Sequence, residues 1–149
     1  MRAVRTQRGV AAVEFALVAV LLLTIAFGAI EFGRAFYQYN TLIKSTRSAV
    51  REFTLAGRIG TIGSREGRAR CLAVYGKTPC DSDRDTSLLA GLTPQLVGFS
   101  TVDATMGGGL PYSYGCVTIV GFQFDSYVPW ILPNISFAPI TTCMRQTAL

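Results

Sequence analysis

The sequence predicts an α+β chain: a long N-terminal helix, transmembrane in its first half and amphipathic in its second, followed by a small antiparallel β-rich domain. Three observations support this fold class. Residues 10–30 are almost entirely apolar, the helical pattern continues without proline to residue 56, and two β-branched and aromatic segments, 116–124 and 135–143, flank a proline-containing loop. At 149 residues, the chain has room for one modest domain.

The apolar run at residues 10–30 is long enough to cross a bilayer. Glu14 and Thr24 are its only polar members, and a helix of this length spans about 30 Å, the thickness of the hydrocarbon layer. The preceding residues contain arginine but no acid, so the N-terminus is expected to stay cytoplasmic while the rest is exported. Three of the five net positive charges belong to this leader: Arg2, Arg5 and Arg8. If the leader is removed, the rest of the chain has little net positive charge, which argues against nucleic-acid binding.

A conventional signal peptide is the alternative interpretation of this segment. Residues 26–28, Ala-Phe-Gly, would then be the cleavage site. The apolar run is longer than a usual h-region, however, and the helical pattern continues past the proposed cut. We therefore expect one helix over residues 10–56, and the alternative is a secreted or membrane-anchored periplasmic binding or adhesion domain.

The second half of this helix has an apolar packing stripe. Apolar side chains recur at alternating steps of three and four residues, Thr46 fills the one gap, and Gly57 is the candidate C-cap. The stripe consists of Phe32, Phe36, Tyr39, Ile43, Val50 and Phe53. It is expected to pack against the chain's own C-terminal domain, to form a seam with partner subunits, or to do both in an assembly.

A carboxylate near the start of a membrane span is costly and requires an explanation. Glu14 lies five residues after Gly9, which ends the basic leader. A cut after Gly9 would make Val10 the first residue and give it a cationic amino group. Glu14, one helical turn further on, could neutralise that amine in its own chain or in a neighbouring one.

Residues 7–17, QRGVAAVEFAL, and 27–34, FGAIEFGR, resemble the TadE-like minor pilins, or pseudopilins, of the tight-adherence (type IVc-like) pilus system. The resemblance is strong over residues 7–53 and looser beyond. It implies cleavage by a prepilin peptidase after Gly9, with Glu14 as the assembly carboxylate and Phe15 as its aromatic neighbour.

The same resemblance implies three segments. Residues 1–9 would be the prepilin leader, residues 10–56 the long helix with its transmembrane part at 10–30, and residues 57–149 a small periplasmic or extracellular domain. The chain would be a structural or priming subunit of adhesive pili, held in the bacterial inner membrane before it reaches the cell surface. Its expected partners are the prepilin peptidase, other pilin subunits, the assembly platform and the lipid bilayer.

Glu31 and Arg34 also belong to the matched pattern, although the resemblance assigns them no role. Because they are three residues apart on a helix, we expect a surface ion pair worth about 0.2–0.5 kcal/mol.

The C-terminal part combines a short helix with strands. Residues 64–75 are expected to be helical, and residues 95–102 to form a strand. The acidic residues at 81–85 lack the glycine and distal glutamate of an EF-hand loop, so we interpret them as a solvated loop. Segments 116–124 and 135–143 are expected to pair as an antiparallel hairpin in which Cys116 faces Cys143 and Phe122 faces Phe137.

Four cysteines beyond an export segment favour two disulfides in an oxidising compartment. Three connectivities are possible. The short spacing between Cys71 and Cys80, and the expected facing positions of Cys116 and Cys143, favour these two pairs.

The sequence offers little for an enzyme. It contains no histidine, no GxSxG motif, no phosphate-binding loop and no clustered metal ligands, so we expect no catalytic residues, no metal and no cofactor. The loop between the hairpin strands has an apolar tip formed by Tyr127, Trp130 and Ile131. The tip is expected either to pack against the long helix or to form a subunit contact or adhesive surface.

Overall fold

The computed structural model describes residues 8–55, 62–105 and 111–146. Most of the expected leader, the candidate C-cap Gly57 and the glycine run at 107–109 lie outside these ranges. The elements in chain order are α1 (Arg8–Leu55), α2 (Ile62–Tyr75), the 3₁₀ helix η2 (Pro94–Leu96), β1 (Val97–Thr105), β2 (Pro111–Ile119), β3 (Gln123–Phe124), β4 (Ile135–Ser136) and β5 (Ile140–Arg145). The α+β fold class expected from the sequence is confirmed.

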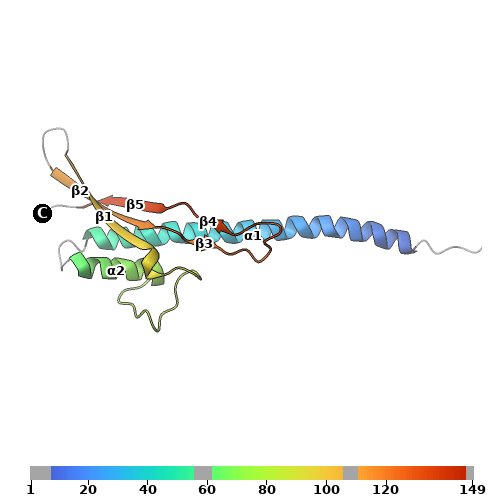
Figure 1. Cartoon of the computed structure of the whole chain (residues 1–149), viewed down its shortest axis with the longest axis horizontal. Helices are drawn as coiled ribbons and strands as arrows, with labels where there is room; N and C mark the ends of the chain where they lie inside the picture. Colours follow the sequence, from blue (N-terminus) through green and yellow to red (C-terminus); the bar gives the residue numbers. More distant parts are fainter. Residues whose placement is uncertain (1–7, 56–61, 106–110, 147–149) are drawn as a thin grey trace, which may run out of the picture.

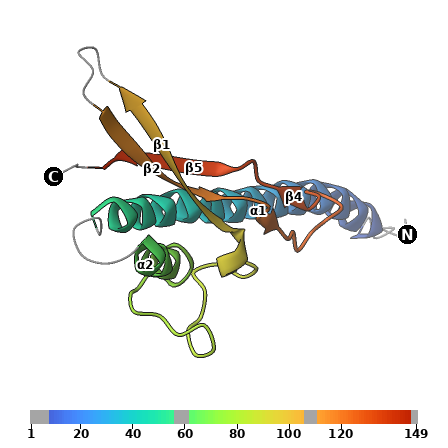
Figure 2. The same ribbon diagram turned by 60° about the vertical axis from the view of Figure 1, so that its left-hand side comes forward.

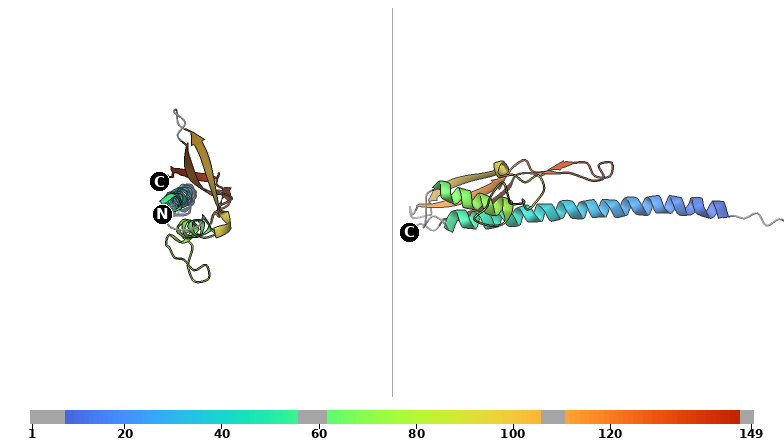
Figure 3. Two further views of the ribbon diagram at one scale, coloured as in Figure 1. Left: turned by 90° about the vertical axis from the view of Figure 1, so that its left-hand side faces the viewer. Right: turned by 90° about the horizontal axis from the view of Figure 1, so that it is seen from below.

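Helix α1 is the axis of the molecule (Figure 1). Its C-terminal half lies between α2 on one side and the sheet on the other, as the end-on view in Figure 3 shows. Its N-terminal half projects beyond both. The change in environment follows the change in sequence, because uniform apolarity gives way to an amphipathic pattern near residue 31.

Three strands form an antiparallel sheet in the order β1-β2-β5 (Figure 2). In this sheet Cys116 pairs with Cys143, Thr118 with Thr141 and Ile119 with Ile140. Beyond it, β3 and β4 form a two-stranded ladder that pairs Gln123 with Ser136 and Phe124 with Ile135. All these pairs have the register expected from the sequence.

The expected hairpin is nevertheless interrupted between its two halves. Gly121 has φ of 76°, a conformation that glycine adopts without a Cβ penalty, and it separates β2 from β3. Pro139 separates β4 from β5, where it could not have donated a ladder hydrogen bond. The Phe137 N–H still donates to the Phe122 carbonyl at 3.0 Å, and the two rings stack at 5.9 Å.

The hydrophobic core lies between α1, α2 and the sheet. Phe53 is its largest contribution from the end of α1, and its ring lies 5.3 Å from the ring of Phe99 on β1. Gly115 on β2 allows this close approach, because a Cβ there would lie 2.8 Å from the Phe53 ring. The other fully buried members from the helices include Leu42, Ala49, Val50, Ala69, Ala73 and Val74.

Both expected disulfides are present. Cys71–Cys80 joins α2 to the loop that follows it, and Cys116–Cys143 joins β2 to β5. In the acidic loop, the carboxylates of Asp81 and Asp85 accept hydrogen bonds from the N–H groups of Asp83 and Asp81, respectively. Asp85 also pairs with Lys77, whose Nζ lies 2.6 Å from Asp85 Oδ1. The hydrogen bond from Lys77, followed by that from the Asp81 N–H, lowers the pKa of Asp85 below its usual value.

Candidate functional site

The N-terminal half of α1 presents a long apolar surface. Most of its large side chains are more than half exposed, including Val10, Phe15 and Leu21 at 63%, 75% and 62%. The helix is long and apolar enough to cross a membrane, and none of the residues in its most apolar window is buried within the described chain. This surface therefore requires lipid or another protein to cover it.

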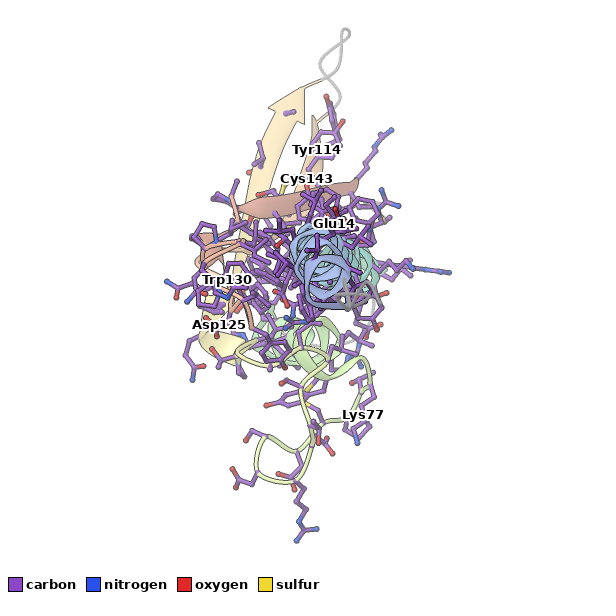
Figure 4. The ribbon with its side chains drawn as sticks, turned by 90° about the vertical axis from the view of Figure 1, so that its right-hand side faces the viewer. Glu14, Lys77, Tyr114, Asp125, Trp130 and Cys143 are labelled. Atoms are coloured by element: carbon purple, nitrogen blue, oxygen red, sulfur yellow. A yellow bond between two sulfur atoms is a disulfide. The ribbon has the colours of Figure 1, made fainter. Side chains whose placement is uncertain are left out.

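Gly9, Val10, Glu14 and Phe15 all lie on this uncovered helix. Apart from the local helix backbone, no described atom lies within 4 Å of the position of a Cβ on Gly9. The Glu14 carboxylate is exposed on α1 (Figure 4) and makes no hydrogen bond or ion pair with the side chains that the structure describes. Because Val10 follows a peptide bond in this chain, pairing between Glu14 and an amine at Val10 stays a prediction.

The packing stripe divides into two parts. Val50 and Phe53 are buried in the core, Ile43 packs against it, and Phe32 and Phe36 remain 69% and 60% exposed. A strict seven-residue repeat drifts by about 20° per heptad around a straight helix, so the two ends of the stripe face different directions. Tyr39, between them, makes an edge-on contact with Phe137, with centroids 5.7 Å apart.

Glu31 is the residue whose environment differs most from the expectation. It is only 2% exposed, although we expected a surface ion pair with Arg34. The pair exists, with Arg34 Nη1 2.7 Å from Glu31 Oε1. The second carboxylate oxygen accepts hydrogen bonds from Ser126 Oγ at 3.1 Å and from the Tyr127 N–H at 3.3 Å. The expectation of an exposed pair was wrong because the loop between β3 and β4 covers it.

Arg34 adds further contacts between α1 and the same loop. Its guanidinium lies 3.7 Å from the centroid of the Tyr127 ring and 5.3 Å from that of Phe124, both in the range of cation–π contacts. Its Nη2 also reaches the Asp125 carbonyl at 3.5 Å. Glu31 and Arg34 therefore fasten residues 125–127 to α1. The sequence signal was an acid–base pair beside an apolar stripe, which does not by itself identify the covering loop.

The apolar tip of this loop is only partly packed. Ile131 is half-buried and faces α1, since its Cγ2 would lie 3.6 Å from a Cβ on Gly28. Tyr127 and Trp130 are 81% and 73% exposed. Figure 4, which looks along α1 from its N-terminal end, shows Trp130 and Asp125 to one side of the helix.

The described residues contain no group of three or more His, Cys, Asp or Glu side chains arranged to hold a metal ion. The prominent features are therefore an uncovered apolar helix and a loop fixed beside it, and both are suited to association.

Comparison with protein families gives a match between residues 9–51 and the model of the TadE-like proteins. The matched segment contains Gly9, Glu14, Phe15, Glu31 and Arg34, so the resemblance noted from the sequence is confirmed over this range. The family is structural rather than enzymatic. Comparisons with curated proteins and with solved structures give no match.

Proposed function

We propose, on the premise that residues 9–51 are a TadE-like pilin segment, that the chain is a minor pilin or pseudopilin of a tight-adherence pilus system. It is inserted through α1 in the inner membrane with its C-terminal domain in the periplasm, and is cut after Gly9 by a prepilin peptidase. It then enters a pilus through contacts of α1, as a structural or priming subunit.

The observation that carries this proposal is the division of α1 into two environments. None of residues 10–30 is buried in the described chain, although Ile131 approaches Gly28, whereas residues near the other end of the same unbroken helix form the core of the folded domain. A subunit that moves from bilayer to filament needs such a helix, because lipid and neighbouring helices must cover the same apolar surface in turn. Phe32 and Phe36 extend that surface beyond the span.

Sequencing the N-terminus of the mature protein tests the processing step. We expect Val10 as the first residue when the chain is produced with its prepilin peptidase, and an uncut chain when the peptidase is absent. A mature protein that begins at Ala29 would instead identify conventional signal cleavage and contradict the pilin proposal.

The Glu14→Ala variant tests the assembly carboxylate. We expect it to insert and to be cut normally but to enter pili poorly, because the amine at Val10 loses the acid that would neutralise it. Immunoblots of membranes and sheared pili give the two readouts. Thr24→Ala is the matched control, since Thr24 is the other polar residue of the span and bonds only the Val20 carbonyl of its own helix at 2.8 Å. Equal incorporation of both variants would contradict the role of Glu14.

A further inference from the structure

The loop between β3 and β4 combines exposed aromatic side chains with a single charged residue, Asp125 at its start. Tyr127 and Trp130 are 81% and 73% exposed, and residues 126–134 contain no ionisable side chain except the phenol of Tyr127. Two large exposed aromatic side chains on one loop that is held against α1 mark a candidate interaction surface.

The loop is fixed at the level where the apolar span ends. Its Ile131 meets α1 at Gly28, and its Ser126 and Tyr127 are bonded to Glu31. The span expected from the sequence ends at residue 30. With a rise of about 1.5 Å per residue, the contacts at 28 and 31 lie within about 3 Å of that end along the helix axis.

We propose that this loop is an interfacial membrane anchor, in which Trp130 and Tyr127 lie among the lipid headgroups beside the periplasmic end of α1. The inference rests on the proposed insertion of α1 and assigns the loop a second contact with the same bilayer. Tryptophan and tyrosine favour this depth because their rings are apolar while their N–H and O–H groups bond to water or headgroups.

Most backbone N–H groups of the loop already have hydrogen-bond partners within the protein, as a region poor in water requires. The N–H groups of Ser126, Tyr127 and Val128 bond to Asn134 Oδ1, Glu31 Oε2 and Ser126 Oγ, respectively. Those of Ile131 and Leu132 both bond to the Val128 carbonyl, at 2.9 and 3.1 Å. Two further positions are prolines, which have no N–H: Pro129 and Pro133. Few backbone donors would therefore lose hydrogen bonds on entering the interface.

While α1 is in the membrane, lipid fits the tip better than another subunit does. A stable protein interface buries on the order of 800 Å² on each partner, whereas a large aromatic side chain supplies roughly 150–250 Å². The area of two exposed aromatic side chains is too small for such an interface, but it is sufficient for insertion among lipid headgroups. Tyr127 also lines the same shallow hollow as Ile30, which is 59% exposed on the apolar helix, so the surface of the tip continues that of the span.

Trp130 is the only tryptophan, so its fluorescence reports this loop alone. The test uses the full chain reconstituted in phosphatidylcholine and phosphatidylglycerol vesicles, with bromine on the lipid chains either near the headgroup or near the bilayer centre. We expect emission to lose most of its intensity with shallow bromines and less with deep ones, and to be weakly quenched by aqueous iodide.

The matched control moves the reporter to the far end of the sheet. In the variant Trp130→Phe with Tyr114→Trp, the new tryptophan lies next to Gly115, which approaches Phe53. That site is about 35 Å along α1 from residue 30, so we expect strong quenching by iodide and none by bromine.

Strong iodide quenching of Trp130 without bromine quenching would overturn the anchor. Protection from both quenchers, lost when the protein is diluted in lipid, would overturn it in favour of a subunit contact. Carbonate washing separates this outcome from failure of the proposed function. A chain that stays in the membrane while Trp130 avoids lipid contradicts the anchor alone, and a chain that washes off contradicts both.

Discussion

Phe53→Ala is expected to lower the free energy of unfolding of the C-terminal domain by about 3–5 kcal/mol, the usual range for removing a buried phenylalanine ring. Phe53 is only 3% exposed, and its ring contacts Phe99 on β1 and lies over Gly115 on β2. Because this ring joins the end of α1 to two strands, its removal leaves a cavity where helix and sheet meet.

Pulse proteolysis of the full chain in detergent, across a urea series, measures this loss. Phe36→Ala is the matched control, since Phe36 belongs to the same sequence stripe but is 60% exposed. We expect Phe36→Ala to leave the urea midpoint almost unchanged. Equal destabilisation by the two variants would contradict the division of the stripe.

The parts of the fold that local patterns determine could be predicted from the sequence. An apolar run followed by an amphipathic pattern extends without proline over α1, and the matching of like residues predicted the pairing of Cys116 with Cys143 and of Phe124 with Ile135. A shift of one residue would have moved every side chain of a strand to the opposite face, so matching like residues was enough to select the register.

Long-range packing could not be predicted in the same way. The pairing of β1 with β2 and the docking of the β3–β4 loop on α1 join segments that share no sequence pattern. Burial of Glu31 follows from that docking, because the residues that satisfy its carboxylate, Ser126 and Tyr127, are more than ninety positions away.

The candidate site likewise has one part that local sequence patterns predict and one part that depends on long-range packing. The motif around Gly9 and Glu14 can be read from sequence because it concerns neighbours on one helix. The loop that accompanies the span can be found only in three dimensions. In the arrangement that we propose, α1 and the β3–β4 loop together set where the folded domain meets the bilayer.

Glu31→Ala is expected to release the β3–β4 loop from α1 while the core stays folded. The change removes both hydrogen bonds to residues 126 and 127 and leaves the Arg34 guanidinium without its carboxylate. Hydrogen bonds to a charged group are stronger than neutral ones, so we expect amide exchange in residues 126–132 to rise about tenfold or more.

Hydrogen exchange with mass spectrometry on the full chain in nanodiscs measures this release, and α1 residues 42–53 provide the internal reference. Glu52→Ala is the matched control, because Glu52 lies on the same helix and pairs with Arg68 at 2.9 Å but does not contact the loop. The control should leave exchange at residues 126–132 unchanged, since partly exposed ion pairs contribute little. If Glu31→Ala left loop exchange at the wild-type rate, the contact at Gly28 and the stacking of Arg34 on Tyr127 would be sufficient to hold the loop, and the buried carboxylate would not be its anchor.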